Sequence, residues 1–291
     1  MGEIYALSTA FIWGFAVILF KKSGETVHPI ALNFFKNIFA LILLLPTIFI
    51  IGKNPLHPAP FYEYLFVLGS GALGIGISDT LFFMSLNRLG AGLSAVVDCL
   101  YSPCIIGLSM LWLGDILTPL QILGTVMIIS AIIAASTLKP GSSRDRKNLI
   151  LGFVYGALAM VTMAVSIVAI KPLLDRSPLL WVMEIRLSGG ILALFPILFI
   201  HRRPRAVIAS LLEVRSWVYT VSGSFVGTYL ALLLWLAGMK FTQTSTAAAL
   251  NQTSNIFVFI FAGLFLKETI DAKRILAITL GVCGTFLVTF G

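Results

Sequence analysis

Four charged side chains interrupt long apolar stretches of this chain: Lys36, Asp79, Asp98 and Arg186. An ionisable side chain near the centre of a membrane span costs about 2.5–3.5 kcal/mol on insertion scales, so each one requires a partner, a wet cavity or a function. Such groups can pair with one another, bind a polar solute or take up a proton. These residues are therefore the first candidates for a functional site.

The stretches that carry these residues have the length of membrane-spanning helices. The chain has 291 residues, of which 58% are hydrophobic and 11% charged, and its mean hydropathy is +1.01. A soluble domain has about 25% charged residues. Apolar runs of about 20 residues recur along the whole sequence, and that is the helical length that crosses a bilayer core. The sequence therefore predicts an all-α integral membrane protein.

Breaks between the apolar runs predict ten transmembrane helices. The expected ranges are 4–21, 29–51, 62–86, 91–112, 118–137, 149–171, 179–200, 216–239, 243–266 and 272–290. A polar stretch at the midpoint reads KPGSSRDRKN. We interpret it as a linker, residues 139–148, between a first repeat of five helices (1–138) and a second (149–291).

The two halves resemble each other in their polar residues and prolines. At spacings of 150 and 153 the matched pairs are Lys21 and Lys171, Lys36 and Arg186, Pro46 and Pro196, Asp98 and Asn251, and Ser102 and Asn255. Because each repeat has an odd number of spans, the second enters the membrane from the opposite side. Inverted repeats of this kind favour a carrier that works by alternating access, with its site near the midplane between the halves.

Three of the charged residues are expected at a similar depth. Asp79 precedes the end of the third helix by about as much as Asp98 follows the start of the fourth, and Lys36 enters the second helix from the same side. At 1.5 Å per residue this depth is roughly 10 Å. We expect these side chains to converge on a cavity, with Arg186 and Asn251 at matching depth from the opposite face. The alternatives are that Lys36 and Arg186 extend to the interface and that the two aspartates only cap or pair there.

Aromatic and amide side chains within the spans are further candidates for substrate binding. Asn251 to Asn255 form the most polar run in any span, and in lipid these amides need partners, a cavity or another helix. The complete set of expected substrate-binding residues is Trp13, Lys36, Asp79, Asp98, Tyr101, Ser102, Arg186, Tyr229, Trp235, Asn251, Gln252 and Asn255, with Asn33 as a further polar candidate.

Short patterns spread over nearly the whole chain resemble a known family. They are Ala10–Gly14 (AFIWG), Gly76–Leu89 (GISDTLFFMSLNRL), Ser102–Pro103, and the paired helix ends Leu111–Pro119 (LWLGDILTP) and Leu264–Asp271 (LFLKETID). Together they resemble the EamA-like, ten-helix branch of the drug/metabolite transporter superfamily. The resemblance implies a fold of ten helices and transport of a small molecule.

This sequence departs from the family in its ninth helix. The family commonly has a proline there, at the position equivalent to Pro103, whereas this chain has Ile256. The second repeat therefore lacks the residue that bends the backbone.

The expected function is secondary transport, with export favoured, of a small polar or amphipathic metabolite such as an amino acid. No GxxxxGK[ST] sequence for nucleotide binding is present, and neither HExxH nor GxSxG indicates an enzyme. An intramembrane enzyme and a passive channel are the alternative functions. We expect no cofactor, and no metal site because Cys99, Cys104 and Cys283 show no metal-ligand spacing. We expect no nucleic-acid partner because the basic residues are dispersed over short loops.

The side of each terminus follows from the distribution of the 20 Lys and Arg residues. Most lie in the loops after helices 1, 3, 5, 7 and 9, which the positive-inside rule assigns to the cytoplasm. Both termini are then outside a cell membrane. Small residues four apart in helices 5 and 10, such as Ala131, Ala135, Ala277 and Gly281, indicate close packing within the chain or against a second copy, so a monomer and a homodimer both fit.

Overall fold

A computed structural model describes residues 1–51, 57–113, 118–136, 146–200, 203–212, 216–242 and 244–290. This part of the chain is almost wholly helical and contains no β-strand. The prediction of an all-α protein is therefore confirmed. Most of the predicted linker, residues 139–145, and Asp115 in the first paired helix end lie outside the described residues.

The first half contains five spans, of which the third and fourth are interrupted. Span 1 is α1 (Gly2–Ser23), span 2 is α2 (Pro29–Ile50), span 3 joins α3 (Phe61–Gly71), η1 (Ala72–Ser78) and α4 (Asp79–Leu89), span 4 joins α5 (Ala91–Asp98) and α6 (Tyr101–Leu113), and span 5 is α7 (Pro119–Ser136).

The second half repeats this order. Span 6 is α8 (Arg146–Arg176), span 7 is α9 (Leu179–Ile200), span 8 joins α11 (Trp217–Gly223), η4 (Ser224–Ala231) and α12 (Leu232–Phe241), span 9 joins α13 (Thr244–Gln252) and α14 (Ser254–Leu266), and span 10 is α15 (Ala272–Phe290). Eight helices of the described chain are long and apolar enough to cross a membrane, and two shorter apolar helices complete the set.

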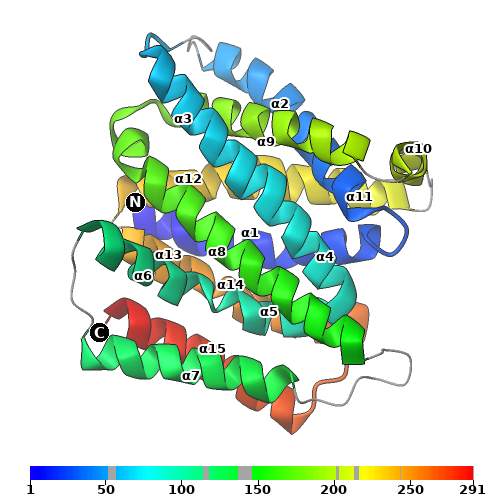
Figure 1. The fold of residues 1–291 in the computed structure, drawn as a ribbon, viewed down its shortest axis with the longest axis vertical. Helices are drawn as coiled ribbons and strands as arrows, with labels where there is room; N and C mark the ends of the chain where they lie inside the picture. Colours follow the sequence, from blue (N-terminus) through cyan, green and yellow to red (C-terminus); the bar gives the residue numbers. More distant parts are fainter. Residues whose placement is uncertain are drawn as a thin grey trace.

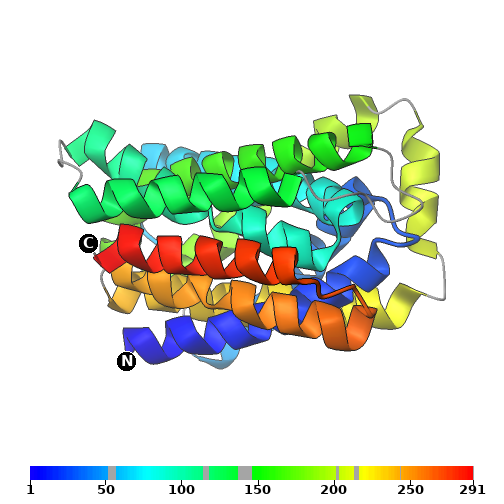
Figure 2. The same ribbon diagram turned by 90° about the horizontal axis from the view of Figure 1, so that it is seen from below.

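The internal repeat is visible in the backbone. The third span of each half contains a π-helical segment, η1 in one and η4 in the other, and the fourth span of each half is broken, at Cys99–Leu100 and at Thr253. Because five spans separate the copies, the second is inverted, and Figure 2 shows both chain termini at the same end of the bundle. The chain is thus a ten-helix membrane protein of two inverted five-helix repeats.

Two lysines donate hydrogen bonds to carbonyls at equivalent helix ends in the two halves. Lys21 Nζ donates to the carbonyl of Asn87 at 3.3 Å, near the end of span 3, and Lys171 Nζ donates to the carbonyl of Met239 at 2.7 Å, near the end of span 8. The last carbonyls of a helix have no partner within it and carry partial negative charge, so an ammonium group stabilises both ends.

The break in span 4 follows from a proline, but the break in span 9 does not. Pro103 has no N–H for the carbonyl of Cys99, and the chain tightens there through a bond from Leu100 N to the carbonyl of Val97 at 3.0 Å. In span 9, Thr253 Oγ1 donates to the carbonyl of Leu250 at 2.6 Å, while Ile256 N donates to the carbonyl of Thr253 at 3.0 Å. Such threonine back-bonding bends helices, so the second repeat breaks without the proline that the family pattern has.

Spans 5 and 10 form a separate pair at one side of the bundle, as α7 and α15 show in Figure 1. A Cβ atom on Gly284 would lie 2.7 Å from the carbonyl oxygen of Gly124, so the two backbones touch. Ala131, Ala135 and Ala277 are each 0% exposed. The small residues noted in the sequence are therefore used for packing within this chain.

One predicted loop contains a short helix. Residues 204–212 form α10 (Pro204–Ala209) and η2 (Ser210–Leu212), where the expected ranges 179–200 and 216–239 leave only a connection between spans 7 and 8. Pro204 stands at the first helical position, where its missing N–H is not needed. In Figure 2 this segment lies across the end of the bundle opposite the termini.

Candidate functional site

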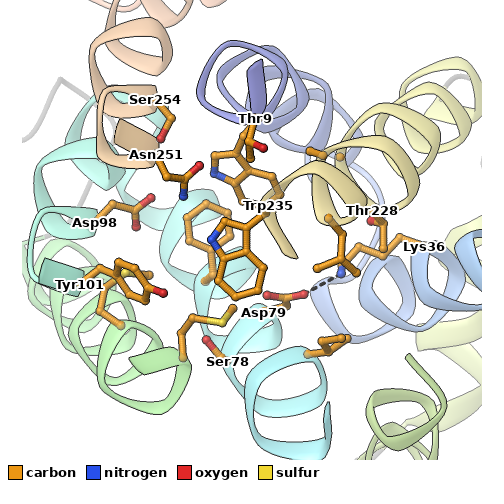
Figure 3. Close-up of a pocket in the computed structure, with 18 of the residues that line it drawn as sticks. Thr9, Lys36, Ser78, Asp79, Asp98, Tyr101, Thr228, Trp235, Asn251 and Ser254 are labelled. Atoms are coloured by element: carbon orange, nitrogen blue, oxygen red, sulfur yellow. Dashed lines mark hydrogen bonds and ion pairs between the residues drawn. The ribbon is translucent and has the colours of Figure 1, made fainter. Parts of the chain in front are cut away.

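A cavity of about 140 Å³ lies where the two halves meet, and Figure 3 shows its lining. Spans 1–4 and 6–9 all contribute to it, and spans 5 and 10 do not. The lining residues are Thr9, Trp13, Lys36, Asn37, Ile75, Ser78, Asp79, Phe82, Asp98, Tyr101, Met160, Met163, Arg186, Gly227, Thr228, Ala231, Leu232, Trp235, Asn251, Gln252, Ser254 and Asn255. The volume suits a small solute, because it is below the roughly 300–1,000 Å³ of pockets that bind drug-sized ligands.

Lys36 and Asp79 form an ion pair inside this cavity. The Nζ–Oδ2 distance is 2.6 Å, and the side chains are 4% and 15% exposed. Lys36 Nζ also donates to Asn37 Oδ1 at 3.1 Å. Lys36 therefore points inward to a carboxylate and an amide and does not extend to the membrane interface.

The π-helical segment η1 is held against span 2 by an asparagine. Asn33 Nδ2 lies 2.8 Å from the carbonyl of Ile75 and 3.0 Å from that of Gly76, and Asn37 Nδ2 donates to Asn33 Oδ1 at 3.0 Å. A wider helical turn leaves carbonyls without their usual partners, and a buried amide can satisfy them. The result is a polar network in which Asn33 and Asn37 fix the π-helical segment that directly precedes Asp79.

Arg186 is the counterpart of Lys36 in the second half, and its side chain is completely buried. Its Nη1 donates to Ser70 Oγ on α3, while Nε and Nη2 have no hydrogen-bond partner among the residues that the structure describes. The backbones of α3 and α9 approach closely here, since a Cβ on Gly71 would lie 2.7 Å from the Cα of Arg186. The guanidinium is thus held at the cavity wall by one contact, with two of its nitrogens unsatisfied.

The breaks in spans 4 and 9 meet on the other side of the cavity. Gln252 Nε2 donates to the carbonyl of Asp98 at 3.1 Å, and Asn255 Nδ2 donates to Gln252 Oε1 at 2.5 Å and to Cys99 Sγ at 3.6 Å. These amides satisfy groups that the breaks expose, so part of the polar run acts as helix–helix contact as well as cavity wall.

Asp98 differs from Asp79 because its carboxylate has no ion-pair partner in the described chain. In Figure 3 it lies near Asn251, across the cavity from Lys36. The Asn251 Oδ1 atom and the hydroxyl of Tyr101 also lack hydrogen-bond partners. This end of the cavity therefore offers carboxyl, amide and hydroxyl oxygen atoms to whatever enters.

Aromatic and thioether side chains separate the two polar ends. Trp13 and Phe82 have ring centroids 6.0 Å apart, and Trp235 projects into the middle of the view in Figure 3. Met160 and Met163 add flexible apolar surface. The cavity can thus accept a solute with an apolar body and polar ends.

The structure brings all of the expected site residues to this cavity except Ser102 and Tyr229. Ser102 is 2% exposed, with a hydroxyl that has no partner and does not line the cavity. The hydroxyl of Tyr229 lies 2.6 Å from Thr47 Oγ1, so this residue joins span 8 to span 2. Its neighbour Thr228 faces the cavity instead, because adjacent helical residues point about 100° apart.

Several lining residues were not singled out from the sequence. They are Thr9, Asn37, Ile75, Ser78, Phe82, Met160, Met163, Gly227, Thr228, Ala231, Leu232 and Ser254. Asn37, Ser78 and Ser254 each adjoin a residue that was singled out, so polar neighbours in an apolar span were an available signal. The apolar lining residues gave none, since they look like any core or lipid-facing residue.

A ten-helix bundle of inverted repeats around a central polar cavity defines a membrane transport protein. The sequence pattern of the EamA-like transporter family matches residues 1–137 and 150–290, once in each half. The chain belongs to this family, and it is a membrane transporter of the drug/metabolite type.

Two known proteins are similar to this chain over almost its whole length. An uncharacterized transporter from Archaeoglobus fulgidus is 24% identical over 287 residues, which are 98% of this chain and 96% of the relative. A protein solved by crystallography has the same fold, with a TM-score of 0.71 and 16% identity over 99% of this chain and 97% of its own.

Proposed function

We propose that this protein is a secondary carrier that exports a small polar or amphipathic metabolite, such as an amino acid, by alternating access around the central cavity. The observation that carries the proposal is the carboxylate of Asp98, which has no ion-pair partner in the described chain and lies across the cavity from Lys36 (Figure 3). A carboxyl group without an ion-pair partner within a membrane span favours a cationic ligand, a hydrogen-bonding ligand or a proton during the working cycle.

The repeat symmetry supports alternating access. Lys36 and Asp98 each lie seven residues into a helix that starts at one face, and Arg186 and Asn251 each lie seven residues into a helix that starts at the other. Each half can then open its own face while the same cavity holds the solute. The interrupted spans 3, 4, 8 and 9 provide backbone that can bend without breaking regular hydrogen bonds elsewhere.

The same proposal includes the location and assembly of the protein. It acts in the cell membrane with both termini outside, in agreement with the basic loops at the opposite face. It needs no cofactor, and its energy comes from a solute or ion gradient. Because the whole cavity is built by one chain, a monomer is sufficient for transport and a homodimer remains compatible with it.

Substrate-dependent thermal stabilisation of the purified protein tests this function. A panel of amino acids and related metabolites would be applied to wild type, to Asp98→Asn, and to Asp175→Asn as a control at a half-exposed carboxylate outside the cavity. We expect a ligand that raises the melting temperature of wild type and the control but not of Asp98→Asn. Equal stabilisation of all three proteins would contradict the assignment of Asp98 to the binding site.

A passive channel and an intramembrane enzyme are the competing functions. Unchanged ligand recovered after incubation distinguishes a carrier from an enzyme. Saturable exchange distinguishes a carrier from a channel, because a channel conducts without binding one solute per cycle.

A further inference from the structure

The two halves differ in how they neutralise equivalent cations. The carbonyl of Asn87 accepts a hydrogen bond from Lys21, and that of Met239 accepts one from the equivalent Lys171. These two acceptors are 152 residues apart, and the same spacing relates Asp79 to Ala231. Lys36 therefore has Asp79 as its partner, whereas the position that would supply a carboxylate to Arg186 is an alanine. Both Ala231 and Arg186 line the cavity.

No substitute for the missing carboxylate comes from elsewhere in the described chain. Arg186 is absent from every ion pair, and its only hydrogen bond from the guanidinium is the one from Nη1 to Ser70. Asp79 is already bound to Lys36 at 2.6 Å. The Nε and Nη2 atoms of Arg186 are buried and have no partner. A buried guanidinium left in this state is costly, so it is suited to a ligand.

The two free nitrogens belong to the same edge of the guanidinium. Nε–H and the adjacent N–H of Nη2 point in parallel, and this edge binds carboxylate and phosphate groups through two hydrogen bonds. Gly74 lets Nη2 and the Ser166 side chain pack against the backbone of η1, because a Cβ there would lie 3.0 Å from Nη2 and 2.8 Å from the Cβ of Ser166. The edge of Arg186 without a partner and the lack of a carboxylate at position 231 therefore occur together.

We propose that Arg186 binds an oxyanion group of the transported solute, a carboxylate or a phosphate, in the place that a carboxylate side chain fills in the first half. The inference rests on the proposed function, since it takes the cavity as the solute site. It adds a requirement: the solute carries an oxyanion at the Arg186 end. Ala231 is thus a specificity-determining position, because a larger acidic residue there would neutralise Arg186 from within.

The test measures the melting temperature of the purified full-length protein at constant ionic strength with potassium chloride, potassium acetate or potassium phosphate. Wild type is expected to gain several degrees in acetate or in phosphate relative to chloride, and the more effective salt identifies the type of oxyanion. Ala231→Asp is expected to lose this gain. Ala231→Asn, which has the same size and no charge, is expected to retain most of it.

Equal responses of wild type and Ala231→Asp to all three salts, including no response in either, would overturn the proposal. If Ala231→Asp does not fold, Arg186→Lys serves instead, because lysine keeps the charge but lacks the two-pronged edge. Loss of the oxyanion response in Arg186→Lys supports the proposal and an unchanged response overturns it.

Failure of the oxyanion proposal can be distinguished from failure of the proposed transport function. A protein that exchanges a solute across vesicles but does not respond to either oxyanion remains a carrier and has another specificity. A protein that responds through Arg186 but exchanges nothing has the oxyanion site without the transport activity.

Discussion

Lys36 and Arg186 occupy equivalent positions in the two repeats but have different surroundings. Lys36 has an ion pair with Asp79 and donates a hydrogen bond to the amide oxygen of Asn37, whereas Arg186 has a single hydroxyl partner in the described chain. Removing only one partner of a buried ion pair strongly destabilises a protein, because the other charge then remains buried without compensation. The first half is accordingly arranged for stability at this point, and the second half leaves a charge available.

Removal of Lys36 alone should destabilise the protein. In Lys36→Met the carboxylate of Asp79 stays in the cavity wall without its cation, and we expect a loss of about 3–5 kcal/mol in the free energy of unfolding. The double variant Lys36→Met with Asp79→Leu should regain most of it, because both charges are gone. Unfolding in mixed micelles measures these values. A single variant as stable as wild type would show that the pair is not a structural contact.

At the scale of elements, the interrupted helices of this protein are held by side chains from other spans. Asn33 binds carbonyls of the π-helical segment in span 3, and Gln252 binds the carbonyl of Asp98 at the break in span 4. Glu268 accepts hydrogen bonds from Ala91 N at 2.8 Å and Gly92 N at 3.1 Å, and so caps the start of span 4 from the end of span 9. The irregular stretches of spans 3 and 4 thus have defined partners on other spans.

Close backbone contact between α3 and α9 is also an element-scale requirement. Gly71→Ala would add a Cβ 2.7 Å from backbone atoms of Arg186, and overpacking of this kind costs about 1–3 kcal/mol. Gly69→Ala, two residues earlier on the same helix, meets nothing within 4 Å and serves as the matched control. We expect a clear fall in melting temperature for the first variant and none for the second. Equal melting temperatures would mean that the two helices can separate freely.

The sequence allowed the spans to be predicted well and the irregular stretches poorly. Apolar length and loop charge are local properties, and they located all ten helices to within a few residues of those observed, apart from the longer α8. The π-helical segments carry no proline, and the break in span 9 depends on a Thr253 side chain that bonds to its own helix. Such features depend on hydrogen bonds in the folded chain, which local propensity does not encode.

Side-chain direction limited the prediction of the site in a similar way. Polar residues were identified by their presence in apolar spans, which finds Lys36 and Asp98 but cannot distinguish Thr228 from Tyr229. The rotation of one helix against its neighbours decides which of two adjacent residues faces the cavity. Ala231 could not be recognised at all, because its role follows only from the comparison of the two folded repeats.

At the scale of the whole molecule, one central cavity is shared by two halves of opposite orientation. Spans 5 and 10 pack against each other and contribute nothing to its lining. In the proposed alternating-access cycle, the remaining eight spans form the part of the molecule that rearranges so that the cavity faces first one side and then the other. In the proposed orientation, the face with most of the basic loops is the cytoplasmic one.

Reporter fusions check the orientation of the molecule. Alkaline phosphatase folds only outside the cytoplasm, and we expect an active enzyme when it is attached to the C-terminus and an inactive one when it is inserted in the stretch 139–148. Fusions with a green fluorescent protein should give the reverse pattern. An active phosphatase in the central stretch would place the termini in the cytoplasm and contradict the orientation that the basic loops indicate.

Counterflow in vesicles tests the carrier function most directly. Vesicles with the purified protein would be loaded with an unlabelled amino-acid mixture and given a trace of the same mixture in labelled form outside. We predict a transient accumulation of label that depends on the internal mixture and saturates with concentration, and that falls at least tenfold in rate, about 1.4 kcal/mol, in Asp98→Asn. Uptake that rises in proportion to concentration without accumulation, or recovery of a chemically altered solute, would contradict the account.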